Sequence, residues 1–265
     1  MKDSILRILP PDCSWKDRFY YVPAIDSTND RLKQLARQGA PHGTVLLAGY
    51  QTAGHGRLGR SFHSPADAGI YMSILLRPDC LPGELMHLTC AAAVAMCDAV
   101  EQSCGFRPRI KWTNDLVSGR SKLGGILTEL AFTSAGKVDY AIIGIGMNCC
   151  QSSDDFPSDI RDIAASLSMV TGKRTDRAAV AAAMIDALWR MDAQLLTNRQ
   201  EILARYRNDC MTLGQDISLI RGEEIRHGTA LSIDDAGALI VRFSDGHTES
   251  VSSGEVSVRG MYGYI

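Results

Sequence analysis

The sequence lacks a strong net charge, a long uninterrupted apolar run and any C-x-x-C pair of cysteines. The formal net charge is −2 at pH 7, so no overall field draws the chain to nucleic acid or to an anionic membrane. No apolar run approaches the length of a membrane span, and Arg7, Pro10 and Pro11 interrupt the N-terminal segment, unlike a signal peptide. These absences predict a cytoplasmic protein without membrane contact.

Eight cysteines are present, but their spacing does not indicate a metal or redox site. Cys90, Cys97 and Cys104 recur every seven residues, which places them on one face of a helix, where they are expected to pack as small core residues. Cysteines without a disulfide pattern are typical of a reducing compartment. The chain has 265 residues, 45% of them hydrophobic, which allows a large core and one or two domains.

The pattern of predicted secondary structure changes near residue 213. Before it, apolar and β-branched runs predict strands, and alanine-rich or capped stretches predict helices. After Gly214, short strand-like runs separated by RGEE, DDAG and SDG predict a small β-barrel. The predicted strands before the boundary are 44–50, 69–76, 109–112, 123–132 and 138–147, and the predicted helices are 27–38, 83–104 and 176–208.

The stretch GHGRLGR at residues 54–60 matches the G-x-G-x-x-G pattern of dinucleotide-binding turns. Such a turn must lie between a strand and a helix, whereas Pro65 and Gly69 follow here and lead into another strand. What remains is a glycine loop that carries Arg57 and Arg60 and is suited to phosphate or carboxylate. Taken alone, it is equally well interpreted as a solvated surface hairpin.

Three later stretches also combine glycine with polar residues. KWTNDL at 111–116 is a strand closed by an Asn-Asp turn, and SKLGGILTEL at 121–130 places Lys122 at the mouth of an apolar strand. IIGIGMN at 142–148 is an apolar strand with two glycines. Each has an ordinary structural interpretation: a turn, a surface lysine and a core strand.

Together and in this order, the stretches resemble the biotin–protein ligases. That family carries a Ser-Thr-Asn helix start, G-R-G-R-x-G-R, K-W-P-N-D, K-x-G-G-I-L-x-E and G-x-G-x-N. This chain has STN at 27–29, GHGRLGR at 54–60, KWTND at 111–115, KLGGILTE at 122–129 and GIGMN at 144–148, and its GEVSVR at 254–259 resembles the end of the family's small barrel. His55 departs from the first loop arginine, and Thr113 departs from the proline, which should only loosen a strand end.

The resemblance implies an α+β fold, in which a mixed β-sheet backed by helices, like that of class II synthetases, spans residues 1–213. An SH3-like β-barrel would span residues 214–265. It also implies two catalytic residues: Lys122, in contact with the biotin carboxylate and the α-phosphate, and Arg57, closing over the adenylate. The implied biotin site comprises Ser27, Thr28, Asn29, Gln51, Gly54, His55, Gly56, Arg57, Lys122, Gly124 and Gly125. The implied ATP site comprises Arg57, Arg60, Phe62, Lys111, Asn114, Lys122, Asn148 and Arg259, with Asp115 as a possible Mg²⁺ ligand.

The reaction implied by the resemblance joins biotin and ATP to biotinyl-5′-AMP, and then passes biotin to a lysine of a biotin carboxyl carrier protein. A carboxylate is already a charged nucleophile, so the first step needs positioning and positive charge rather than a base. A lipoate–protein ligase is the alternative. A biotin-sensing repressor is disfavoured because about 25 residues precede the STN stretch, too few for a DNA-binding module. No DNA partner is therefore expected, and a homodimer is possible.

Overall fold

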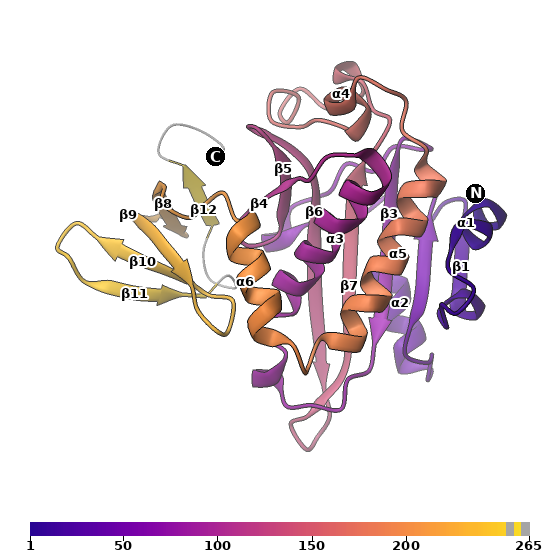
Figure 1. The fold of residues 1–265 in the computed structure, drawn as a ribbon, viewed down its shortest axis with the longest axis horizontal. Helices are drawn as coiled ribbons and strands as arrows, with labels where there is room; N and C mark the ends of the chain where they lie inside the picture. The colour runs from indigo at the N-terminus through magenta and orange to yellow at the C-terminus, as the bar shows by residue number, and fades with distance from the viewer. Residues whose placement is uncertain (253–256, 261–265) are drawn as a thin grey trace.

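The computed structural model describes residues 1–252 and 257–260. Its centre is a seven-stranded mixed sheet with the order β1-β2-β3-β7-β6-β5-β4 (Figure 1). β1 and β2 are parallel, and the other neighbouring pairs are antiparallel. The strands are β1 (Phe19–Val22), β2 (Thr44–Ala48), β3 (Gly69–Leu76), β4 (Arg109–Lys111), β5 (Asp115–Ser118), β6 (Ser121–Phe132) and β7 (Val138–Asn148).

Helices cover both faces of this sheet. α3, α5 and α6 lie on one face, and α2 lies on the other (Figure 1). The STN stretch begins α2 because the hydroxyl of Ser27 accepts a hydrogen bond from the backbone N–H of Asp30 at 3.3 Å and caps the helix. The helices are α1 (Lys2–Ile8), α2 (Thr28–Arg37), α3 (Leu88–Cys104), α4 (Leu167–Thr171), α5 (Arg177–Gln194) and α6 (Arg199–Asp209).

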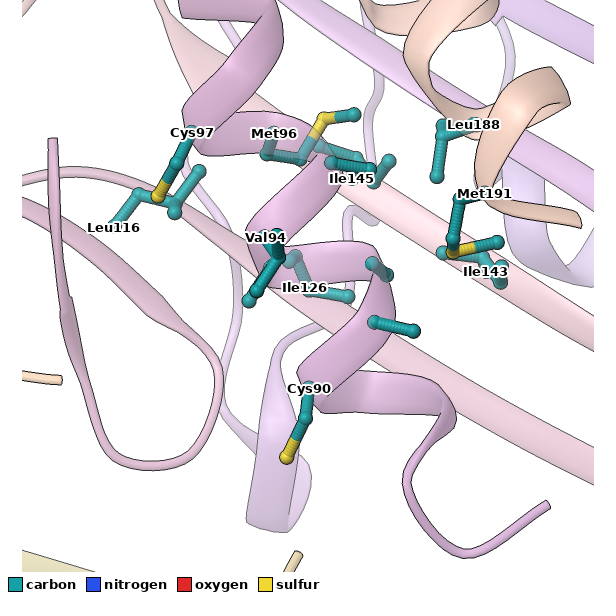
Figure 2. Packing of buried hydrophobic residues seen from close by; sticks show 14 of the residues in the cluster. Cys90, Val94, Met96, Cys97, Leu116, Ile126, Ile143, Ile145, Leu188 and Met191 are labelled. Carbon is teal, nitrogen blue, oxygen red and sulfur yellow. The ribbon is translucent and has the colours of Figure 1, made fainter. Parts of the chain in front are cut away.

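The core lies between α3 and the sheet. In Figure 2, Val94 and Cys97 of α3 point toward Ile126 and Leu116 of the sheet. Cys90 and Cys97 are buried, and burial raises the pKa of the Cys90 thiol to about 12. The expected core role is confirmed for these two cysteines, since such thiols stay protonated and pack as apolar groups. Cys104 is half-buried and packs against the same core.

The C-terminal part is a five-stranded antiparallel sheet with the order β11-β10-β9-β8-β12. The predicted β-rich texture after Gly214 is thus confirmed, although residues 254–256 of the GEVSVR stretch lie outside the described residues. The boundary at residue 213 stays a prediction; α6 ends at Asp209, and the first strand of this sheet begins at Asp216. The strands are β8 (Asp216–Arg221), β9 (Glu224–Ile233), β10 (Leu239–Phe243), β11 (Thr248–Val251) and β12 (Ser257–Gly260).

Several predicted elements differ from the observed ones. The helix expected over 83–104 begins only at Leu88, because Pro82–Glu84 forms a separate 3-10 turn. The helix expected over 176–208 is two helices, α5 and α6, because the chain reverses between them and both pack against α3. α1, β1 and β5 were not predicted, since each is shorter than eight residues and carries little periodic pattern.

One stretch of the described chain, Pro82–Cys104, has the length and apolar composition of a membrane span. This stretch is not an uninterrupted apolar run, because it contains Glu84, Asp98 and Glu101. Most of this stretch is buried inside the protein, which is the behaviour of a central core helix.

Candidate active site

A cavity of about 710 Å³ lies where the glycine loop, the β4–β5 turn, β6 and β7 meet. It brings together nearly all the residues that the motifs predicted, although they come from distant parts of the chain. Gly54 and Gly124 are the exceptions and do not line it. The predicted residues that do line it are Ser27, Thr28, Asn29, Gln51, His55, Gly56, Arg57, Arg60, Phe62, Lys111, Asn114, Asp115, Lys122, Gly125, Asn148 and Arg259.

The floor of the cavity is β7, and its two glycines make room for side chains from elsewhere. A Cβ at Gly144 would lie 2.1 Å from Oδ1 of Asn29, and one at Gly146 would lie 2.4 Å from the ring of Phe62. Residues two apart on a strand share a face, so positions 144, 146 and 148 follow one line of roughly 13 Å. The G-x-G-x-N stretch therefore forms the floor of the cavity, with Asn29 at one end and Asn148 at the other.

Neutral hydrogen-bonding groups gather at the Asn29 end. The backbone N–H and the hydroxyl of Thr28 both donate to Oε1 of Gln51, at 2.9 and 3.0 Å. Nε2 of Gln51 donates to Oγ of Ser64 at 3.1 Å. Ser73, which the motifs missed, is fully buried, with its hydroxyl 2.7 Å from Oγ1 of Thr28 and 2.5 Å from Oδ1 of Asn29. This network fixes the side chains that a small polar ligand would meet.

Charged groups gather at the other end of the floor. Nζ of Lys122 lies 2.7 Å from Oδ1 of Asp115, across the β5–β6 pair. Nη1 of Arg57 donates to Oδ1 of Asn114 at 2.9 Å, so the loop arginine reaches the β4–β5 turn. Burial lowers the pKa of the Arg57 guanidinium from its ordinary value, but arginine remains charged at neutral pH. The cavity therefore joins a neutral end to a cationic end.

Lys111 is 6% exposed and lies within this charged end. The pKa of its ammonium is lowered to about 8, mainly by burial; Asp115 opposes this shift, and the charges of Lys122, Arg259 and Arg60 contribute to it. Like charges at short range repel one another, so an anion such as a phosphate group would be bound favourably beside these cations.

The depressed pKa of Lys111 predicts a pH-dependent stability. Between about pH 8 and the ordinary value of 10.5, the unfolded chain binds this proton and the folded chain does not, so the free energy of unfolding should rise with pH. Lys111→Met should remove that rise. Urea unfolding of both proteins across this window measures it, and identical pH slopes would show that Lys111 titrates normally.

Within the glycine loop, Gly54 is the position where a side chain cannot fit. A Cβ there would lie 2.8 Å from the carbonyl oxygen of Phe62 and from Oγ of Ser64. For Gly56, the glycine pattern of the loop predicts a positive φ or the closest approach of the chain. Its φ is instead −116°, and a Cβ would lie 3.3 Å from the nearest atom, the carbonyl oxygen of Arg60. The close approach of the chain therefore belongs to Gly54, which lies against Ser64 and the cavity residue Gln51.

His55, which replaces the family's arginine, is tied to α2. Its Nε2 lies 2.7 Å from Oδ2 of Asp30, and both side chains are more than a third exposed. Burial raises the pKa of Asp30, but hydrogen bonds from Lys33 and His55 outweigh it, so the net pKa lies below the ordinary value. Exposed pairs of this kind contribute little stability, roughly 0.2–1 kcal/mol.

We therefore expect His55→Ala and His55→Arg to keep biotin affinity within about tenfold, below roughly 1.4 kcal/mol. Gly54→Ala should lose far more biotin affinity, because its Cβ would collide with the atoms that hold Gln51. Biotin titrations of the three variants measure this. If His55→Ala proved as damaging as Gly54→Ala, the histidine side chain itself would be part of the biotin site.

Sequence reasoning missed one wall of the cavity. Phe156, Ile160, Ile163 and Ala164 line it from the segment after β7. This wall is fixed next to Lys122, because the backbone N–H of Lys122 donates to the carbonyl of Ile163 at 2.7 Å. The alternation of apolar and acidic residues in FPSDIRDIA was the available signal, and it falls in a segment without regular structure.

The remaining predicted residues lie at the charged end. Nδ2 of Asn148 donates to the carbonyl of Ala165 at 3.1 Å, and Arg259 reaches the cavity from β12 of the C-terminal sheet. Thr113, the second departure from the family pattern, does not leave the strand end loose. It is buried, and Tyr206 of α6 donates a hydrogen bond to its carbonyl at 3.0 Å.

No group of three metal-binding side chains occurs within residues 1–252 and 257–260. Asp115 is the single carboxylate among the described residues that line the cavity, and it is paired with Lys122. A dedicated protein-only metal site is therefore not indicated in this part of the chain. The arrangement suits a Mg²⁺ ion that is held mainly by substrate phosphates, with one carboxylate.

Comparison with known proteins agrees with this geometry. The model of the biotin/lipoate A/B protein ligase family matches residues 21–148, and that of the biotin protein ligase C-terminal domain matches residues 212–259. The chain belongs to this family, within its biotin–protein ligases, as the motifs predicted.

Two curated relatives illustrate the similarity. The bifunctional ligase/repressor BirA of Bacillus spizizenii is 37% identical over 85% of this chain and 70% of its own length. The biotin–[acetyl-CoA-carboxylase] ligase of Mycobacterium tuberculosis is 32% identical over 89% of this chain and 86% of its own length. Among solved structures, the Aquifex aeolicus biotin protein ligase in complex with biotin and ATP has a TM-score of 0.78 and 28% identity, over 92% of this chain and 99% of that one. The predicted fold is thus confirmed.

Proposed function

We propose that this protein is a biotin–protein ligase that forms biotinyl-5′-AMP from biotin and ATP and transfers the biotin to a lysine of a carrier protein. The observation that carries the proposal is the single cavity that joins a neutral hydrogen-bonding end to a cationic end. A ureido ring needs neutral donors and acceptors, whereas the triphosphate of ATP needs cations. Both requirements are met along one strand floor.

The neutral end would hold biotin. Thr28 and Gln51 are positioned to hydrogen-bond the ureido ring, and Asn29 is fixed against Gly144 by Ser73 and Glu129. The carboxylate of biotin would then extend toward Lys122, which already holds a carboxylate, that of Asp115, at 2.7 Å. This contact illustrates the geometry with which the lysine can receive an anionic substrate.

At the cationic end, Lys122 would neutralise the biotin carboxylate and the α-phosphate as they approach. Arg57, Arg60 and Lys111 would offset the charge that develops on the phosphates and on the leaving pyrophosphate. Positioning and charge suffice, because a carboxylate needs no base to attack phosphorus. Phe62 would pack against adenine, Asn114, Asn148 and Arg259 would contact the nucleotide, and Arg57 would cover the adenylate from its loop.

Mg²⁺ would accompany ATP, with Asp115 as its protein ligand. One carboxylate and several phosphate oxygens are a common environment for this ion, which keeps part of its water shell. When bound, the ion would add positive charge at the phosphates. Lys122 would then exchange Asp115 for substrate, which leaves the Asp115 carboxylate available to the metal.

The acceptor would be a lysine of a biotin carboxyl carrier protein. This proposal rests on relatives named biotin–[acetyl-CoA-carboxylase] ligase. A cytoplasmic location, a homodimer and the absence of a DNA partner remain proposals from the sequence. A DNA-binding assay with biotin and ATP tests the last of these.

Biotin-dependent exchange of labelled pyrophosphate into ATP tests the proposed function directly. The wild-type protein should catalyse the exchange with biotin and, when a carrier domain is added, should label its lysine. Lipoate in place of biotin should give far less exchange. A protein that exchanges pyrophosphate only with lipoate would be a lipoate–protein ligase instead.

A further inference from the structure

The turn between β9 and β10 forms a rigid tip of the C-terminal sheet. Oδ1 of Asp234 accepts hydrogen bonds from the backbone N–H groups of Ala236 and Ala238, both at 2.9 Å. The hydroxyl of Ser250 donates to Oδ2 of the same aspartate at 2.7 Å. Gly237 has a φ of +82°, the left-handed region that glycine adopts without strain. The turn therefore holds the Gly237 carbonyl in one orientation.

This tip packs against α3 and α6, which belong to the part of the protein that precedes the C-terminal sheet. A Cβ at Gly237 would lie 2.9 Å from Sγ of Cys90 and 3.7 Å from Cα of His87, at the start of α3. Just before the turn, Nε of Arg207 on α6 donates to the carbonyl of Ile233 at 2.8 Å. Two helices thus fix where the Gly237 carbonyl points.

The carbonyl points at a residue of the cavity. The indole Nε1 of Trp112 donates to the oxygen of Gly237 at 3.1 Å in a buried hydrogen bond. The backbone N–H of Trp112 donates to Oγ1 of Thr212, in the linker to the C-terminal sheet, at 2.9 Å. Trp112 itself lines the cavity, and its neighbours Lys111 and Asn114 line the charged end. The C-terminal part therefore holds the turn that carries these groups.

We propose that Trp112 is a positioning residue for the nucleotide end of the cavity, and that the Gly237 carbonyl sets its place. The proposal rests on the proposed function for the identity of the nucleotide. ATP affinity should then depend on a contact remote from ATP, because a shift of Trp112 moves Lys111 and Asn114 with it. Biotin affinity should not depend on this contact, because Thr28, Gln51 and Asn29 are held by α2 and β3 instead.

Titration calorimetry with ATP and, separately, with biotin tests the proposal without requiring turnover. Trp112→Phe keeps an aromatic ring but removes the donor, and Gly237→Ala displaces the carbonyl. Each should raise the Kd for ATP by about three- to tenfold, as expected for one buried hydrogen bond. The Kd for biotin should stay within about twofold. The double variant should match the single ones, since both changes break one contact.

Two matched controls separate positioning from general destabilisation. Gly246→Ala changes a glycine with φ +88° in another turn of the same sheet, where a Cβ meets open space. Trp15→Phe removes a buried indole elsewhere in the core. Both should lower the melting temperature without raising the Kd for ATP.

Equal ATP effects of Gly237→Ala and Gly246→Ala, an additive double variant, or a parallel loss of biotin affinity would each overturn the proposal. If Gly237→Ala fails to fold, comparing the Kd for ATP of Trp112→Phe with that of Trp15→Phe tests the proposal in the same way. A wild-type protein that binds ATP but not biotin would contradict the proposed function instead. The ATP titrations would still test whether the Trp112–Gly237 hydrogen bond affects ATP affinity.

Discussion

Lys122→Ala is expected to reduce biotin-dependent pyrophosphate exchange by at least 100-fold while the protein stays folded. In the proposed reaction this lysine receives two anions, and losing one preorganised charge at such a point costs roughly 3 kcal/mol or more. Its removal also leaves Asp115, at the same place, without the ammonium 2.7 Å away. Two carboxylates and a phosphate would then repel one another across the reacting atoms. Initial exchange rates with saturating biotin and ATP measure the effect.

Lys137→Ala is the matched control for Lys122→Ala. Lys137 also pairs with an aspartate, with its Nζ 2.8 Å from Oδ1 of Asp79, but on the surface at the far end of β6 and β7. Its loss should leave exchange unchanged. If Lys122→Ala retained exchange within a few-fold of wild type, the lysine would not be the group that receives the two anions.

Gly144→Ala is expected to weaken biotin binding by about 100-fold, the largest effect we predict for a single methyl group. Its Cβ would lie 2.1 Å from Oδ1 of Asn29, so the asparagine must leave its place on β7. Asn29 would then lose its hydrogen bonds to Ser73 and to Glu129, at 2.5 and 2.8 Å. The first of these bonds is buried and the second joins a charged group, and breaking bonds of these kinds costs about 1–3 kcal/mol each. Calorimetric titration with biotin measures the loss.

Gly83→Ala controls for the glycine-to-alanine change itself, since a Cβ at Gly83 has nothing within 4 Å and no positive φ. It should leave biotin affinity unaltered. An Asn29→Ala background gives a second check, because Gly144→Ala should cost little more once the asparagine side chain is gone. Fully additive losses would mean that the glycine acts on the site by another route than Asn29.

The motifs predicted which residues form the site better than they predicted the contacts that hold those residues in place. They identified the residues that converge on the cavity, because the glycines and charges of GHGRLGR, KWTND, KLGGILTE and GIGMN are unusual for strand ends. They did not predict why Gly144 and Gly146 are needed, since the partners of these glycines, Asn29 and Phe62, are distant in sequence. Ser73 was missed for the same reason: a serine in a buried strand acquires its role only when α2 packs over it.

Elements with a strong local pattern were predicted, whereas several short elements and one helix end were missed. β3, β6, β7 and α2 carry strong patterns or caps, and they were placed almost correctly. The break between α5 and α6 lacks glycine and proline, so local propensity predicted one helix where packing against α3 requires two. Gly56 is a related error, because a pattern of glycines does not tell which of them has no room for a side chain.

Paired calorimetric titrations of the wild-type protein with biotin and with lipoate test the central claim most directly. In the proposed biotin site, the hydrogen-bonded network of Thr28, Gln51, Asn29 and Ser73 would suit a ligand with hydrogen-bonding groups at the end opposite its carboxylate, which biotin has and lipoate lacks. We therefore predict clear binding of biotin and binding of lipoate at least 100-fold weaker, a difference of about 2.7 kcal/mol or more. Equal affinities, or tighter binding of lipoate, would contradict the account.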